Sequence, residues 1–228
     1  MVYKIITTRA RVFIESLVLS VVILIIGFSI GYYLESYRTQ GVVADYKEHE
    51  VSALDLKLQN YYYQIMDESA CSAAINQNFV FADQIYSEGL KLEKYEEANQ
   101  IRDDLLVEKK RYVLLKDELW LNTILLKNKC KANFDTLVYF YSQDPGSSGI
   151  VAQQKIISNI LKSIKESRKN SLILIPIAGD LDLGTVNLQR RIYNITYLPS
   201  ILINEKNLLE GYQSEDKILS YLNKSSVS

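Results

Sequence analysis

The segment YNITYLPSILIN, from Tyr193 to Asn204, indicates how the second half of the chain folds. Pro199 comes just before the apolar run SILI, and the first residue of a strand is a position that tolerates proline. A second strand is expected from Asn207 to Gln213, after a short turn. The two strands are therefore expected to pair antiparallel, with the first opening on Pro199.

Around this pair, alternating apolar runs and helical patterns predict an α/β domain at 134–224, with the order β-α-β-α-β-β-α. Strands that are joined by helices are expected to be parallel, with right-handed crossovers. The expected elements are a strand at 136–141, a helix at 150–166, a strand at 171–177, a helix at 185–194, strands at 198–203 and 207–213, and a helix from 214 to 221.

This order and the segment 193–204 resemble the thioredoxin superfamily, in which a proline after a bulky residue opens the third strand. The resemblance implies a cis peptide bond at Leu198-Pro199. The stretch FYSQDPGSSG at 140–149 is similar to the junction between the family's first strand and its active loop. The preceding helical hairpin, which ends in a cysteine, resembles membrane-anchored archaeal thioredoxin-like proteins.

The active loop departs from the family. Relatives that exchange disulfides carry Cys-x-x-Cys at the start of the first helix, where the helix N-terminus lowers the thiol pKa. Here 144–152 contains no cysteine, and a serine hydroxyl cannot cycle through a disulfide. The single histidine, His49, lies far away in the sequence. The sequence thus predicts no catalytic residue and no cofactor.

The same loop is where relatives dock extended polypeptide, so the resemblance implies a binding surface for an unidentified polypeptide. The candidate residues are Ser147, Ser148, Leu198 and Pro199.

An uncharged stretch separates Glu15 from Glu35, and 12–34 is long and apolar enough to be a transmembrane signal anchor in the lipid bilayer. A cleavable signal peptide and a buried soluble helix are the alternatives. Gly27 and Gly31 form a GxxxG pair that would allow close packing of two spans.

Basic residues predict the orientation of this single-pass membrane protein. Lys4, Arg9 and Arg11 precede the span, against Arg38 and Lys47 after it. The bias predicts a cytoplasmic tail at 1–11 and an extracytoplasmic location for the rest.

Residues 35–133 are expected to form a helical stalk, because Gly89 is the only helix-breaking residue between Ala44 and Cys130. Helices are expected from the membrane toward Cys71, from Phe79 after the polar Asn76–Asn78, and from Ile101 or Asp103, with a hairpin tip at Asn99-Gln100. Two apolar stripes are typical of a coiled coil and allow a homo-oligomer through this region. They are Val51, Leu54, Leu58, Tyr61 and Ile65, and Ile101, Leu105, Tyr112, Leu115, Leu119 and Leu126.

The two cysteines are nearly equidistant from the expected tip. Cys71 lies 29 residues before Gln100 and Cys130 lies 30 after it, so both would lie at the open end of an antiparallel hairpin. An extracytoplasmic location favours oxidation, and we expect a disulfide between them. Two unrelated buried thiols are the alternative.

Other signals are weaker. Asn194 and Asn223 open glycosylation sequons. Asp180 and Asp182 suggest a calcium pair, but solvated acids are the favoured interpretation, so no metal site is expected. A net charge of −1 gives no electrostatic argument for nucleic acid, and 225–228 is a short tail.

Three functions remain open. The favoured one is a redox-inactive binding or scaffold protein. The second is a thiol–disulfide oxidoreductase, or its accessory, that uses Cys71 and Cys130. The third is a structural coiled coil tethered to the membrane, whose self-association would depend on Leu115 and Leu119.

Overall fold

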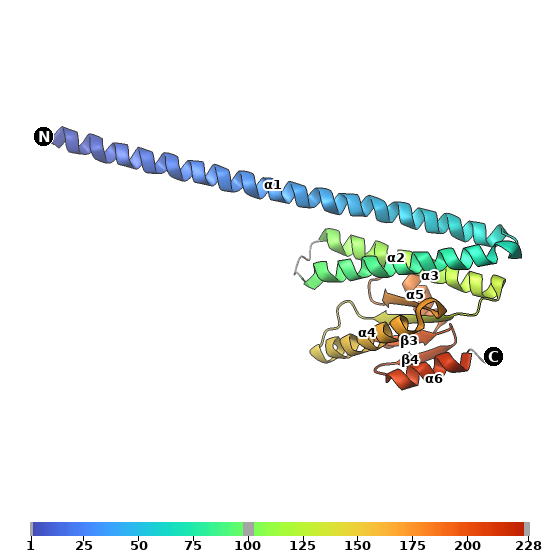
Figure 1. Cartoon of the computed structure of the whole chain (residues 1–228). Helices are drawn as coiled ribbons and strands as arrows, with labels where there is room; N and C mark the ends of the chain where they lie inside the picture. The colour runs from blue at the N-terminus through green and yellow to red at the C-terminus, as the bar shows by residue number, and fades with distance from the viewer. Residues whose placement is uncertain (1, 98–102, 226–228) are drawn as a thin grey trace. The chain divides into compact units, whose positions relative to one another are not determined.

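A computed structural model describes residues 2–97 and 103–225 (Figure 1). The chain divides into two compact units, 1–50 and 51–228. Helix α1, Val2–Ile65, contributes to both units. In the first unit, Val12–Tyr33 is the one described segment long and apolar enough to cross a membrane, and its side chains are exposed to the surroundings. The expected span at 12–34 thus has a matching 22-residue candidate, while its orientation stays a prediction.

In the second unit, α1 is followed by the short 3-10 helix η1, Glu68–Ala70, and by two long helices, α2, Cys71–Glu97, and α3, Asp103–Cys130. The expected helix start near Phe79 is wrong, because α2 runs through Asn76–Asn78 without a break. Asn78 is fully buried and its amide donates to Thr123 Oγ1 on α3 (3.0 Å), so a polar residue here joins helices rather than ending one. The expected tip at Asn99-Gln100 lies outside the described residues.

The strands form one four-stranded sheet in the order β2-β1-β3-β4. The pair β1/β2 is parallel, whereas β1/β3 and β3/β4 are antiparallel. The elements are β1 at Asp135–Tyr141, α4 at Ser148–Arg168, η2 at Lys169–Ser171, β2 at Leu172–Ala178, α5 at Gly184–Ile192, β3 at Ser200–Ile203, β4 at Asn207–Glu210 and α6 at Glu215–Ser225.

The direction of β3 differs from the rule that helix-joined strands run parallel. Helix α5 has nine residues, about 13 Å, which is shorter than the roughly 20 Å length of β1. The connection starts and ends at the same edge of the sheet: the Gly179 N–H donates to the Tyr141 carbonyl (2.8 Å), and a Cβ on Gly179 would lie 3.0 Å from a Leu198 methyl. The chain therefore enters β3 from the edge where β1 and β2 end.

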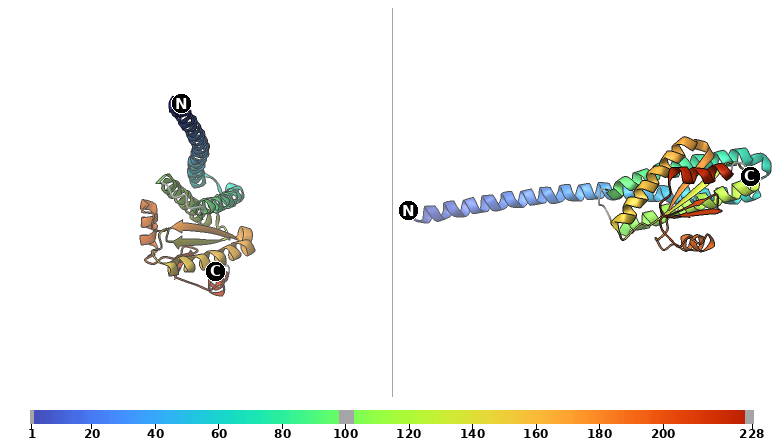
Figure 2. Two further views of the ribbon diagram at one scale, coloured as in Figure 1. Left: turned by 90° about the vertical axis from the view of Figure 1, so that its left-hand side faces the viewer. Right: turned by 90° about the horizontal axis from the view of Figure 1, so that it is seen from below.

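Each face of the sheet is covered by different helices (Figures 1 and 2). The α2–α3 hairpin and α5 share one core with the sheet, in which Trp120, Phe140 and Ile175 are fully or almost fully buried. Helices α4 and α6 cover the other face through a separate apolar cluster that includes Ile157 and Ile218. The hairpin and the strands thus form one unit, and the expected boundary at 133/134 does not separate two cores.

The two apolar stripes have opposite environments. On α3, Tyr112, Leu115 and Leu119 are buried in the core shared with the sheet, so this stripe is not free for self-association. On α1, the residues from Val51 to Ile65 that were expected to pack are exposed, and the opposite side of the helix supplies the buried residues Leu56 and Tyr63.

The cysteine pair lies at the open end of the hairpin, as expected. The sulfur atoms of Cys71 and Cys130 are 1.98 Å apart and their Cα atoms 5.6 Å apart. A small apolar cluster that contains Tyr63 and Leu126 packs beside them. The disulfide therefore joins the start of α2 to the end of α3.

Candidate binding edge of the sheet

The candidate residues gather at the edge of the sheet where β1 ends and β3 begins. Ser147 is the N-cap of α4, and its hydroxyl accepts a hydrogen bond from the Ile150 N–H (3.4 Å). Ser148 opens the helix, and both serines are exposed. The structure places Ser200, the first residue of β3, opposite Phe140 in the antiparallel register, which brings Pro199 to the same edge.

The Leu198-Pro199 peptide bond is cis, as the resemblance implied. Pro199 is buried and its carbonyl accepts from the Gly211 N–H (2.8 Å), while Leu198 is half-buried. Within the described residues no hydrogen bond joins the serine pair to this proline pair. The four candidates thus share an edge but come from two separately held segments.

A carboxylate that the sequence interpretation had left to solvent shapes this edge. Asp180, in the loop after β2, accepts from Ser142 Oγ (2.5 Å) and from the backbone N–H groups of Gln143 (2.8 Å) and Asp144 (3.2 Å). We call these three contacts the Asp180 clamp. It ties the loop after β2 to the loop that precedes the candidate serines.

The charge state of Asp180 follows from these contacts. Partial burial by itself raises the pKa of its carboxyl group, but the hydrogen bonds from Ser142, Gln143 and Asp144 favour the ionised form and outweigh it. The net pKa lies below the ordinary value for aspartate. The clamp is therefore ionised and fully formed at neutral pH.

Helix α4 holds the same loop from its other side. The Gln154 amide accepts from the Ser142 N–H (2.7 Å) and donates to the Ser142 carbonyl (3.0 Å). Ser142 is thus bonded through its backbone to α4 and through its hydroxyl to Asp180. This double attachment defines the start of the cysteine-free loop.

The segment before the cis peptide is held by an arginine. Arg190 donates from Nη1 to the Gly179 carbonyl (2.9 Å) and from Nε to the Ile195 carbonyl (3.2 Å). Gly179 has a packing reason to lack a side chain, because Leu198 occupies the space. These contacts fix the backbone that leads into Pro199.

The exposed surface around the edge is aromatic and polar. Tyr197 and Tyr212 are about half exposed, and Gly211 lies between Tyr197 and Gln153 of α4. Tyrosine offers a flat apolar ring and a hydroxyl in one side chain, which suits contact with a polypeptide. No cysteine lies in this loop.

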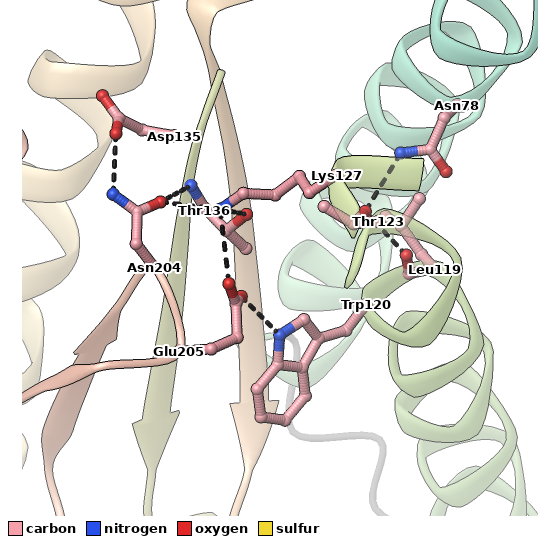
Figure 3. A network of polar contacts seen from close by, with 9 residues as sticks. All are labelled: Asn78, Leu119, Trp120, Thr123, Lys127, Asp135, Thr136, Asn204 and Glu205. Atoms are coloured by element: carbon pink, nitrogen blue, oxygen red, sulfur yellow. Dashed lines mark hydrogen bonds and ion pairs between the residues drawn. The ribbon is translucent and has the colours of Figure 1, made fainter. Parts of the chain in front are cut away.

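A second polar cluster lies at the opposite end of the sheet (Figure 3). Lys127 Nζ on α3 donates to Asn204 Oδ1 (2.9 Å), to Thr136 Oγ1 (3.2 Å) and to Glu205 Oε2 (3.3 Å). Glu205 also accepts from Trp120 Nε1 (3.0 Å). These residues, the Lys127–Glu205 cluster, attach α3 to the sheet.

The turn that supplies Asn204 and Glu205 has positive φ at both residues, as a type I′ hairpin turn requires. Asparagine adopts this conformation readily. Its side chain also reaches Asp135 Oδ1 (2.7 Å) and accepts from the Thr136 N–H (2.8 Å). Sequence reasoning predicted a tight turn here but not its contact with the hairpin.

The remaining predicted sites are placed as follows. Asn194 is exposed at the end of α5, beside a shallow depression, and Asn223 Oδ1 accepts from Arg168. Whether either sequon is used stays a prediction. Asp182 accepts from the Asn187 amide (3.1 Å), and no group of three or more potential metal ligands occurs among the described residues.

No protein-family model and no curated protein matches this chain. Among solved structures, the chain is similar to chloroplastic thioredoxin z, which is described as defining a type-specific target recognition. The similarity covers 46% of this chain and 88% of that chain, with 15% identity and a TM-score of 0.33. The mixed sheet and the order of helices and strands described above are compatible with a thioredoxin-like fold.

Proposed function

We propose that this chain is a membrane-anchored, redox-inactive thioredoxin-like protein that binds an extended polypeptide on the extracytoplasmic side. The observation that carries the proposal is the candidate binding edge itself. There a cysteine-free loop, fixed by the Asp180 clamp and by Gln154, lies beside the cis Leu198-Pro199 segment. A preformed, partly aromatic edge favours binding, because little conformational entropy is lost when the partner docks.

The position of the disulfide supports a non-redox role for this edge. Cys130 precedes the start of β1, whereas Ser147 and Ser148 follow its end. The strand between them has seven residues and spans roughly 20 Å. A polypeptide docked at Pro199 would therefore lie far from the sulfur atoms of Cys71 and Cys130.

Site-specific crosslinking in native membranes tests the proposal. A photoreactive residue at Ser148 is expected to give a discrete polypeptide adduct, and the same residue at Ser220, exposed on α6, serves as the matched control. Adducts at Ser148 that do not exceed those at Ser220 would count decisively against a binding edge.

The redox alternative has its own experiment. If Cys71 and Cys130 exchange disulfides with a substrate, the protein reduces insulin in the presence of dithiothreitol, and Cys130→Ser abolishes the activity. We expect the wild-type protein and the variant to be equally inactive. Insulin reduction that is lost in the variant would favour the oxidoreductase.

The proposed orientation is tested separately. The variants Lys4→Cys and Ser220→Cys are each treated with a membrane-impermeant maleimide on intact cells. Labelling at position 220 alone is expected from the positive-inside rule. Labelling at position 4 alone would reverse the proposed topology.

A further inference from the structure

We propose that the exposed stripe on α1, formed by Val51, Leu54, Leu58, Tyr61 and Ile65, pairs in parallel with the same stripe of a second copy of this chain. The pairing does not require polypeptide binding, but it rests on the membrane anchor of the proposed function. Its first support is exposure: these side chains are 54% to 79% exposed, although all five are large and apolar or aromatic.

The opposite side of the same helix segment is already used. Leu56 is fully buried in the core shared with the sheet, and Tyr63 packs in the cluster beside the disulfide. The Asn60 amide donates to Asn122 on α3, and Lys129 Nζ donates to the Tyr63 carbonyl (2.9 Å). These contacts fix the rotation of α1 in this unit, so the stripe faces away from its own hairpin.

The spacing of the stripe identifies the kind of partner. Successive residues are 3, 4, 3 and 4 positions apart, which is the a/d pattern of a heptad repeat. A helix with an apolar repeat of 3.5 residues has a narrow apolar seam, which fits the seam of another such helix. A helix that packs on a membrane surface or a globular core has a broader apolar face. The partner that matches is therefore an α-helix with the same repeat.

The candidate membrane span favours α1 of a second copy as the partner helix, in parallel orientation to α1 of the first. In every copy, 17 residues (34–50) connect Tyr33 to Val51. Two anchored copies thus have the N-terminal ends of their stripes tethered to one membrane on the same side. Tethering raises the effective concentration of one stripe around the other, which a seam of only about two heptads needs in order to pair.

The charges that flank the seam do not strengthen a parallel pairing. In the same heptad numbering Glu50 lies at a g position and Asp55 at the e position that follows it, so a parallel pair brings two like charges together at its rim. The next g and e positions are Lys57 and Tyr62, which do not repel each other. The pairing is therefore expected to be weak without the membrane, and stronger at high salt, where the Glu50–Asp55 repulsion is screened.

Disulfide crosslinking of the full-length chain in lipid bilayers tests the pairing and its direction. The native cysteines are bonded to each other, so Val51→Cys, Leu54→Cys or Leu58→Cys each introduces a single free thiol. A parallel seam predicts that all three variants form covalent dimers, because each residue meets its own copy. An antiparallel seam allows at most one of the three to do so.

Matched controls are the exposed residues Val80 on α2 and Leu121 on α3, changed to cysteine in the same way. Peptide mass analysis confirms in each case that Cys71–Cys130 is intact. We expect crosslinked dimer at the three stripe positions to exceed both controls at least about fivefold. Stripe variants that crosslink no more than the controls, or only to other proteins, would overturn the proposal.

A second variant guards against artefacts of the new thiols. Leu54→Gln with Leu58→Gln removes apolar surface from the seam but leaves the buried side of α1 intact, so the fold is expected to persist. Dimerisation in bilayers is expected to weaken about tenfold or more, as the loss of two buried leucines requires. Unchanged dimerisation in this variant, with Leu121→Gln as control, would equally refute the pairing.

Discussion

The two ends of the sheet use the same kind of contact for different purposes. At the end where β1 begins, the Lys127–Glu205 cluster is shielded, with both side chains less than a fifth exposed, and it attaches α3 to the β3–β4 turn. At the end where β1 finishes, the Asp180 clamp is open to solvent and joins two loops. Charged hydrogen bonds contribute more to stability when water is excluded. The first end therefore stabilises the attachment of α3 to the sheet, whereas the second end shapes an exposed surface.

This difference explains why the hairpin cannot be regarded as a detachable stalk. One face of the sheet has its apolar cover from α2, α3 and α5, and the largest fully buried side chain of that cover is Trp120. The candidate binding edge is therefore built on a sheet whose stability depends on residues more than 60 positions away from Pro199.

Trp120→Ala is expected to lower the free energy of unfolding more than any other substitution considered below. The indole is fully buried, lies edge-on to Phe140 (6.0 Å between ring centroids) and 5.3 Å from the ring of Tyr193, and donates to Glu205. Its removal leaves a cavity and takes one of two donors from the Glu205 carboxylate, so the free energy of unfolding is expected to fall by about 3–5 kcal/mol. Urea denaturation followed by circular dichroism measures it.

The control is the neighbouring Leu121, which is 44% exposed. Leu121→Ala is expected to lower the unfolding free energy by less than about 1 kcal/mol. A similar loss in both variants would mean that α3 is not held to the sheet through Trp120.

Glu205→Ala removes the acceptor of the Lys127–Glu205 cluster without changing the core. Trp120 Nε1 loses its partner and Lys127 keeps Asn204 and Thr136, so the unfolding free energy is expected to drop by about 1–3 kcal/mol. Glu210→Ala, an exposed change on β4, is the control. Because Glu205 and Trp120 share a contact, the double variant with Trp120→Ala should lose less than the sum of the single losses.

Asp117, on α3, tests how much a buried carboxylate lowers the free energy of unfolding. It is 2% exposed, and neither carboxyl oxygen has a hydrogen-bond partner in bonding geometry among the described residues. Burial raises its pKa to about 6, and the neighbouring Thr185, Gln189 and Lys116 offset only part of this effect. Because the folded pKa exceeds the unfolded one, Asp117 lowers stability as pH rises from about 4 to about 6.

Asp117→Asn is therefore expected to stabilise the protein at pH 7, by about 1–2 kcal/mol. Below about pH 4 the difference from the wild type should vanish, because both carry a neutral side chain there. Urea midpoints measured from pH 4 to pH 7.5 check the sign. A destabilised variant at pH 7 would indicate that the ionised form has partners in solution.

Part of this fold follows directly from the sequence. Compact apolar runs bounded by turn residues, and a proline at the entry to a strand, predicted the order of strands and helices and the segment around Pro199. The cysteine pairing was also predictable from hairpin symmetry, although the first helix ends at Ile65 and α2 begins at Cys71 itself. Such features depend on residues close together in the sequence or on the lengths of the helices.

Other features depend on tertiary contacts, and the sequence did not predict them. Periodicity indicates that a helix has an apolar face but not what covers it, so the stripes containing Leu58 and Leu119 were given the same role, although one is exposed and the other buried. The direction of β3 depends on where the connection after β2 returns. The role of Asp180 depends on N–H groups that only the folded loop brings together.

The smallest effect is expected at the end of the sheet where β1 finishes. Asp180→Asn removes the charge that accepts from Ser142, Gln143 and Asp144. Because the clamp is solvent-exposed, the loss of unfolding free energy at pH 7 is expected to stay below about 1 kcal/mol. Urea denaturation measures this loss, with Asp182→Asn, at the exposed position two residues further on, as the control.

The pH dependence of Asp180 should be opposite to that of Asp117. The folded-state pKa of Asp180 is lowered, so its stabilisation is present above the ordinary aspartate pKa of about 3.9 and is lost as pH falls through the folded value. Asp180→Asn should therefore approach the wild type as the pH falls below about 4, from the less stable side, whereas Asp117→Asn approaches it from the more stable side. The same sign of stability change for Asp180→Asn and Asp117→Asn at neutral pH would contradict this interpretation. Solvent exposure would then not explain the difference between Asp180 and Asp117.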